Sequence, residues 1–243
     1  MKKILSWPFS ILSSLAFVLS LLFGHVLFLL VMPFGQYLRW RMAYFVNHII
    51  NSSLCFSGTT YRAEGRENLN NLEGNIIIVS NHQSMMDIPF IGVVFQKYAP
   101  RFIAKRELGR GIPFISLRLR NGGGILIDRG NASQAIKAIE KQAPEIAAQG
   151  GAICIFPEGT RAKDGIMKRF KPSGLRVLMK ALNNPMIVPV SISNSWKLLM
   201  YKMMPLPFGT PVKMVIHPAI HTAGQSAESV IEKVEAIIRA RVE

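Results

Sequence analysis

The sequence predicts an α/β fold, in which a mostly parallel sheet is flanked by helices and preceded by an N-terminal hydrophobic helical membrane anchor. Two observations lead to this prediction. No Asp, Glu, Lys or Arg occurs between Lys3 and Arg39, so the apolar excess of the chain lies at its start. Past Arg62, short apolar runs alternate with segments of helical periodicity, a pattern typical of parallel α/β sheets. We therefore predict anchoring helices in residues 1–60 and an α/β domain in residues 61–243.

The first apolar run, Ile11–Val31, has about 21 residues and would be roughly 31 Å long as a helix, enough to cross a hydrocarbon core. Aromatic and basic residues flank the run, as they do at membrane interfaces. A cleaved signal peptide is the alternative, but no small-x-small cleavage site follows. Pro33 and Gly35 should end this helix, and a second helical segment is expected at 36–56. Two arrangements stay open, a helix that spans the bilayer or a helix pair that lies in one leaflet.

The remaining elements follow from apolar β-branched runs, which predict strands, and from capping residues, which predict helix starts. Ser84 and Asp87 stand at capping-box spacing, and either Asn131 or Ser133 should cap the helix that contains Pro144. In chain order we predict a strand at 75–80, a helix at 84–96, strands at 101–104 and 125–127, a helix from 131 or 133 to 149, a strand at 152–156, a helix at 173–182, strands at 186–192 and 212–216, and a helix at 228–242.

The first candidate site is the pair His82 and Asp87, in the stretch "SNHQSMMD" that follows the strand at 75–80. On one continuous helix the two residues would not share a face, because five residues turn through about 500°. If the strand ends at Asn81 and a helix begins near Ser84, the chain folds back and brings them together. An aspartate that accepts from one ring N–H leaves the other imidazole nitrogen free to take a proton. The alternative is an ordinary hydrogen-bonded histidine in a turn.

The second candidate site is the stretch "IFPEGTRAKDG", which follows the strand at 152–156. Gly159 permits a tight turn, Thr160 and the turn amides are donors, and Arg161 offers a planar fork suited to a phosphate. Glu158 is expected to hold Arg161 or the turn backbone, since it would repel a bound phosphate. Lys105 follows another predicted strand and would add a second cation. The alternative is a surface loop with solvated charges.

Taken together, these stretches resemble the glycerophospholipid acyltransferase family, most closely its bacterial 1-acyl-sn-glycerol-3-phosphate (lysophosphatidic acid) acyltransferases. Four blocks carry the resemblance in the family's order. They are N-H-x-x-x-x-D at Asn81–Asp87, "GILIDR" at Gly124–Arg129, "FPEGTR" at Phe156–Arg161 and "MIVPVSIS" at Met186–Ser193. One departure is "RFKPSG" at 169–174, one residue longer than the F-K-x-G often found there, which puts the geometry of that loop in doubt.

The resemblance implies an enzyme that moves a fatty acyl group from a thioester, acyl-CoA or acyl-ACP, to the sn-2 hydroxyl of 1-acyl-sn-glycerol 3-phosphate. His82, oriented by Asp87, would deprotonate the hydroxyl, and phosphatidic acid would form without an acyl-enzyme intermediate. Arg161 and Lys105 would hold the 3-phosphate, with Arg129 assisting. The residues named above in the turn, Glu158, Gly159 and Thr160, would support that site. No cofactor and no metal are expected beyond the acyl donor as co-substrate.

The resemblance also implies a place in the bacterial inner (cytoplasmic) membrane, with the catalytic domain on the cytoplasmic side. The net charge of +15, from 29 basic and 14 acidic residues, fits contact with anionic membrane lipids. Residues 161–180 hold seven Lys or Arg and one acid, Asp164. This segment is either a solvated face or a docking surface for anionic headgroups, coenzyme A phosphates or acidic acyl carrier protein.

The sequence leaves three alternative functions to compare with this one. The nearest is an acyltransferase that acts on another lysophospholipid or on glycerol 3-phosphate. A metal-dependent hydrolase could combine His82 and Asp87 with His217 and His221, but Pro218 argues against the helix that would align those histidines. Nucleic-acid binding is not expected, because residues 161–180 lack clustered aromatic residues for base stacking.

Overall fold

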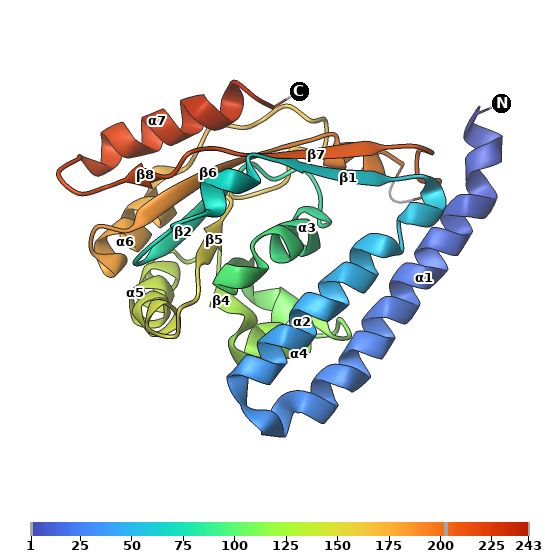
Figure 1. Ribbon diagram of the computed structural model, residues 1–243, viewed down its shortest axis with the longest axis horizontal. Helices are drawn as coiled ribbons and strands as arrows, with labels where there is room; N and C mark the ends of the chain where they lie inside the picture. Colours follow the sequence, from blue (N-terminus) through green and yellow to red (C-terminus); the bar gives the residue numbers. More distant parts are fainter. Residues whose placement is uncertain (1, 202–203, 243) are drawn as a thin grey trace.

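The computed structural model describes residues 2–201 and 204–242, of which residues 2–5 are described by their backbone only. Eight strands form one sheet in this part of the chain (Figure 1). Their bounds are β1 Thr60–Glu64, β2 Ile76–Ser80, β3 Arg101–Lys105, β4 Gly124–Ile127, β5 Ile153–Ile155, β6 Met186–Ser193, β7 Pro211–Ile216 and β8 Ile220–His221.

The spatial order of the strands is β1-β7-β6-β2-β5-β3-β4, and β8 pairs with the start of β6. Among the described strands, β7 and β8 run antiparallel to β6, and the other pairs are parallel. The predicted mostly parallel sheet is therefore confirmed. Its central strands β2, β5 and β3 end at the same edge, so the residues that follow them meet there.

Helices cover both faces of this sheet (Figure 1). Their bounds are α1 Lys2–Val31, α2 Gly35–Ser52, α3 Asp87–Val94, α4 Ile115–Arg118, α5 Ala132–Ala148, α6 Pro172–Leu182 and α7 Ala227–Arg239. Alternate residues of β2 face opposite sides, as the two-residue period of a strand requires. Ile76 and Ile78 join the core formed with α1 to α4, while Ile77 and Val79 join the core formed with α5 to α7. The result is a three-layer arrangement with the sheet in the middle.

Each predicted strand lies within one residue of the observed strand at both ends. Asn131 caps α5, because its side-chain oxygen accepts a hydrogen bond from the Gln134 N–H at 2.9 Å. The helix predicted at 84–96 was too long, since α3 spans only Asp87–Val94. Residues 84–86 instead form a turn around the Asp87 carboxylate. The strands β1 and β8 and the short helix α4 were not predicted.

The N-terminal segment folds into a hairpin of α1 and α2 (Figure 1). A short helical turn at Met32–Phe34 contains Pro33, and Gly35 takes a φ of 83°, so the predicted break is confirmed. The inner side of the hairpin contributes Leu21, Phe28 and Val46 to the core shared with the sheet. The predicted boundary between residues 1–60 and 61–243 falls at the first residue of β1 and stays a prediction.

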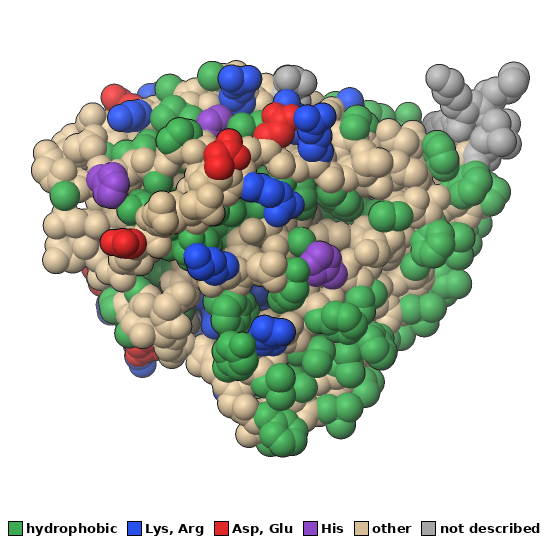
Figure 2. Space-filling model, in the orientation of Figure 1, with side chains coloured by type: hydrophobic (Ala, Val, Ile, Leu, Met, Phe, Trp, Pro, Cys, Tyr) green, Lys and Arg blue, Asp and Glu red, His purple; other side chains and the backbone are tan. Residues whose placement is uncertain are grey.

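The outer side of the hairpin is exposed and apolar, and Figure 2 shows hydrophobic side chains gathered over these two helices. It includes Trp7, Ile11, Leu15, Leu19, Leu22, Val26 and Leu30 on α1. The segment Ser6–Ser57 is the one described stretch whose length and composition suit a membrane span, with 28% of its most apolar window buried. An exposed apolar surface of this size marks the hairpin as a candidate membrane anchor. Both predicted arrangements, spanning and lying in one leaflet, stay predictions.

Candidate active site

Asn81 fixes the point where the chain leaves β2. Its side chain is buried and accepts a hydrogen bond from the Ile192 N–H at 2.7 Å while donating to the Ile192 carbonyl at 2.8 Å. These two bonds pair the end of β2 with β6 as an added rung of the sheet would. The next residue, His82, is thereby held at the carboxyl edge of the sheet.

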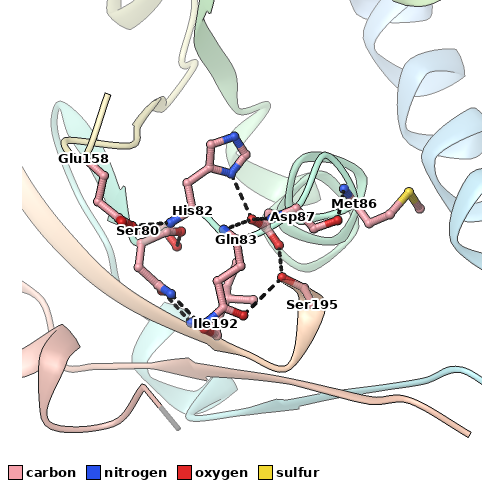
Figure 3. A network of polar contacts seen from close by, with 10 residues as sticks. Ser80, His82, Gln83, Met86, Asp87, Glu158, Ile192 and Ser195 are labelled. Carbon is pink, nitrogen blue, oxygen red and sulfur yellow. Dashed lines mark hydrogen bonds and ion pairs between the residues drawn. The ribbon is translucent and has the colours of Figure 1, made fainter. Parts of the chain in front are cut away.

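His82 and Asp87 lie side by side, as the sequence predicted (Figure 3). The histidine Nδ1 is 2.9 Å from the aspartate Oδ2. The same Oδ2 accepts hydrogen bonds from the backbone N–H groups of Gln83 and Ser84, both at 2.8 Å. Because an ionised carboxylate only accepts, Nδ1 carries the proton and Nε2 is left free. Residues 84–86, which the sequence predicts to be helical, therefore form the turn that supports this pair.

Ser195 also holds the Asp87 carboxylate, and the sequence reasoning missed it. Its hydroxyl donates to Asp87 Oδ1 at 2.5 Å (Figure 3). Asn194, with a φ of 67°, turns the chain just after β6 and directs Ser195 back toward α3. The nearest sequence signal is the run "SNSWK" after the fourth block of the resemblance, and nothing in it singles out this serine.

Phe156 supports the histidine ring from its face. The two rings are stacked, with 4.1 Å between their centroids and 17° between their planes. The imidazole is thus held by a carboxylate at one edge and an aromatic ring on one face. Its side chain is 11% exposed, and the exposed part lines a cavity.

Glu158 takes a different role from the predicted one. The sequence reasoning expected it to hold Arg161 or the backbone of its own turn. Instead it is buried, and its two oxygens accept from the backbone N–H groups of His82 at 2.7 Å and Lys168 at 2.8 Å. Burial raises the pKa of this carboxyl above its ordinary value, and the two N–H donors and His82 oppose that shift. Glu158 therefore ties the loop after β5 to the histidine segment.

The turn that carries Arg161 is fixed against the same segment. Gly159 has a φ of 71°, a conformation that suits glycine, and its N–H donates to the Phe156 carbonyl at 3.0 Å. One residue beyond Arg161, the Ala162 N–H donates to the His82 carbonyl at 2.8 Å. The arginine is therefore presented beside the histidine by backbone contacts.

A cavity with about 1430 Å³ of empty space, including the part open to solvent, joins these groups. Its polar lining includes the predicted residues His82, Lys105, Arg129, Thr160 and Arg161, and in addition Asn47 and Arg118. Glu158 and Gly159, the other predicted supporting residues, shape the turn and are not among the lining residues.

The rest of the cavity is mostly apolar. Side chains from the N-terminal hairpin, the segment before α3, β3 and α4 line it, among them Phe17, Leu21, Ile50, Met85, Phe102 and Ile115. The cavity therefore offers cations and a histidine in one part and hydrocarbon in the other. Such a lining fits an amphiphilic ligand with an anionic head.

The predicted phosphate-binding cations differ in their surroundings. The Lys105 Nζ is 2.9 Å from the Glu107 carboxylate, and both side chains are largely exposed. Among the described residues, Arg161 and Arg129 form no ion pair. Arg161 is thus the cation beside His82 whose guanidinium has no acidic partner in the described part of the chain.

The metal-site alternative is not supported by the topology. His221 lies in β8 opposite Met186, at the start of β6, whereas His82 follows the end of the parallel strand β2. His217 contacts the Ser191 hydroxyl through Nε2 at 2.8 Å. The described residues contain no group of three or more His, Cys, Asp or Glu side chains that could hold a metal ion.

The chain matches a protein family and several known proteins. Residues 60–193 match the family model described as Acyltransferase. The chain is 28% identical over 202 residues to a 1-acyl-sn-glycerol-3-phosphate acyltransferase of Pseudomonas aeruginosa, covering 83% of this chain and 75% of that protein. It is 31% identical to the protein of the same name from Borreliella burgdorferi, covering 79% and 74%.

A solved structure has the same fold over the whole length. The crystal structure of the 1-acyl-sn-glycerophosphate (LPA) acyltransferase PlsC from Thermotoga maritima superposes with a TM-score of 0.75 and 27% identity. The match covers 100% of this chain and 96% of that one, so it includes the N-terminal hairpin as well as the α/β domain.

Proposed function

The chain belongs to the Acyltransferase family, and we propose that it transfers a fatty acyl group from an acyl thioester to the sn-2 hydroxyl of 1-acyl-sn-glycerol 3-phosphate. The product is phosphatidic acid. One observation carries the proposal: a histidine oriented by a carboxylate lines the same cavity as an arginine that has no acidic partner among the described residues, and most of the other lining residues are apolar. The names of the relatives point to the same reaction.

In this reaction the free Nε2 of His82 accepts the proton of the acceptor hydroxyl. The hydroxyl oxygen attacks the thioester carbonyl, and the tetrahedral adduct then releases the thiolate. The thiolate takes the proton back from the imidazolium, so the histidine returns to its starting state. Asp87 stabilises the imidazolium between the two proton transfers. A positioned base of this kind typically contributes about 10²–10⁴-fold to the rate.

The cations place the acceptor. The Arg161 guanidinium, together with Lys105 and with Arg129 assisting, binds the 3-phosphate and so presents the sn-2 hydroxyl to His82. Each charge-assisted hydrogen bond contributes about 1.5–3 kcal/mol. The apolar part of the cavity receives hydrocarbon of the substrates. The acyl donor is acyl-CoA or acyl-ACP, and the reaction as written uses no metal and no cofactor.

The hairpin and the net charge support a setting for the reaction at a membrane. The exposed apolar face of α1 and α2 anchors the protein in the bacterial inner membrane, with the α/β domain on the cytoplasmic side, where acyl donors are found. The basic segment 161–180 adjoins the Arg161 turn and attracts anionic lipid or an acidic acyl donor to the cavity.

The test is an assay of the purified full-length chain with 1-acyl-sn-glycerol 3-phosphate and an acyl thioester, following phosphatidic acid and free thiol. Glycerol 3-phosphate and other lysophospholipids serve as competing acceptors. His82→Ala should lower the rate at least about 10²-fold with an unchanged melting temperature. A wild-type rate in this variant, or a clear preference for another acceptor, would contradict the proposal.

Arg161→Ala tests the phosphate role. It should raise KM for the acceptor about tenfold or more and leave KM for the acyl donor unchanged, because only the phosphate contact is lost. Arg169→Ala is the matched control, since Arg169 is exposed in the same basic segment and does not line the cavity. Equal effects of the two substitutions would mean that Arg161 acts only through the general charge of the surface.

A further inference from the structure

A second, smaller cavity lies under the N-terminal hairpin, at the opposite end of β3 from Lys105. It has about 270 Å³ of empty space, including the part open to solvent. Three arginines from three different elements line it: Arg39 of α2, Arg101 at the start of β3 and Arg118 at the end of α4. The cavity shares Arg118 and Gly123 with the large cavity but contains none of the proposed catalytic residues.

These three guanidinium groups have no acidic partner among the described residues. Arg101 is only 6% exposed; it donates to the Ala99 carbonyl at 2.6 Å, and its buried Nε has no hydrogen-bond partner. The Arg39 Nε donates to the Gly35 carbonyl at 3.2 Å, and within residues 2–201 and 204–242 no hydrogen bond joins the Arg118 side chain to another residue.

The lowered pKa values of two of these arginines show that the arrangement is electrostatically unfavourable. Burial, with repulsion from Arg101, lowers the pKa of Arg118 to about 10, and burial lowers that of Arg101 as well. Arg101 is buried, whereas Arg39 and Arg118 are partly exposed. Neighbouring cations without acidic partners are unfavourable, and a bound anion offsets that cost. An anionic ligand would therefore stabilise this site.

We propose that this cavity binds a phosphate group, held by the guanidinium groups of Arg39, Arg101 and Arg118. Guanidinium groups are planar forks that bind phosphate oxygens in pairs, and here arginines from three elements line one cavity. The walls are ordered by neighbouring contacts: the Gln36 amide donates to the Gln149 side chain at 2.6 Å, and the Asn121 amide donates to the Leu117 carbonyl at 2.7 Å.

The position of the cavity suits the phosphate of a membrane lipid. Gln36, Arg39 and Trp40 of its lining lie in the first turns of α2, next to the exposed apolar side chains of Phe34 and Tyr37 at the tip of the hairpin. A headgroup beside this tip would reach the cavity from the lipid surface. Free phosphate carries the same chemistry, so the test has an arm for each source.

Binding is measured by isothermal titration of the full-length chain in neutral detergent, with inorganic phosphate and with a short-chain phosphatidylglycerol as separate probes. All variants carry Arg161→Ala, so that phosphate at the proposed acceptor site does not contribute. Arg39→Gln tests the cavity, and Arg41→Gln is the matched control. Arg41 lies two residues along the same helix, is exposed, and does not line the cavity.

Arg39→Gln should raise the dissociation constant about tenfold or more relative to Arg41→Gln, as the loss of a hydrogen bond to a charged group predicts. An effect with both probes assigns the site to any phosphate, and an effect with phosphatidylglycerol alone assigns it to lipid. Arg101→Gln should act in the same direction if its melting temperature is retained, and otherwise Arg39→Gln decides. Equal dissociation constants for Arg39→Gln and Arg41→Gln with both probes would overturn the proposal, whatever the outcome of the acyl-transfer assay.

Discussion

Replacing Ser195 by alanine removes one of the four donors that hold the Asp87 carboxylate. The lost contact is a 2.5 Å hydrogen bond to a charged acceptor in a site where the serine is 1% exposed. Such a bond contributes about 1.5–3 kcal/mol. Three donors to the other oxygen remain, from His82, Gln83 and Ser84, so the carboxylate should stay beside the histidine but its orientation should be less fixed. We expect kcat/KM to fall roughly tenfold, equivalent to about 1.4 kcal/mol, well short of the loss expected when the base itself is removed.

The pH dependence separates this positioning role from a loss of stability. Without the Ser195 hydroxyl more negative charge stays on the carboxylate and stabilises the imidazolium of His82. The acid limb of the pH–rate profile should therefore move to higher pH.

Ser191→Ala is the control. Ser191 is also 1% exposed and loses bonds to His217 and the Ile238 carbonyl, so it should lower the melting temperature without moving the acid limb. An unchanged profile and rate in Ser195→Ala, or the same profile shift in Ser191→Ala, would refute the reasoning.

Two further predictions concern stability. Asn81→Ala leaves the buried N–H and carbonyl of Ile192 unpaired and should lower the free energy of unfolding by about 2–4 kcal/mol, measured by denaturant titration; a loss below 1 kcal/mol would mean that the two bonds are replaced. Burial, aided by repulsion from Arg241, lowers the pKa of His217 below its ordinary value, so the folded state binds fewer protons there than the unfolded state. This contribution favours folding above about pH 6.5 and is lost as the pH falls below that value. Between about pH 7 and pH 5, the melting temperature of His217→Gln should therefore fall less than that of the wild type.

The strands and the catalytic edge could be predicted because their signals are local. Runs such as "IIIVS" in β2 are buried on both faces and are apolar up to their last residue. The strand β1 was missed for the opposite reason. It lies at the edge of the sheet, and its sequence "TYRAE" is partly exposed, so no apolar run marks it. The pairing of β1 with β7 joins residues far apart in the chain, such as Thr60 and Pro211, and has no local signal at all.

The candidate site divides in the same way. His82 and Asp87 are five residues apart and belong to one recognisable block, so their contact could be anticipated. Ser195 reaches Asp87 from 108 residues away, and serine is too common a residue to be singled out by type. Glu158 was assigned the wrong partner because its true contact, the His82 backbone, depends on the parallel pairing of β2 with β5.

The hairpin forms a wall of the large cavity and is also the candidate membrane anchor, which limits how the protein can be divided. Phe17, Leu21 and Ile50 close one side of the large cavity, and Leu21 and Ile50 also belong to the core that covers the sheet. A shortened chain beginning near Thr60 would gain solubility only by uncovering that core and opening the site to water. The candidate membrane surface and the closure of the large cavity therefore depend on the same two helices, and neither can be removed without the other.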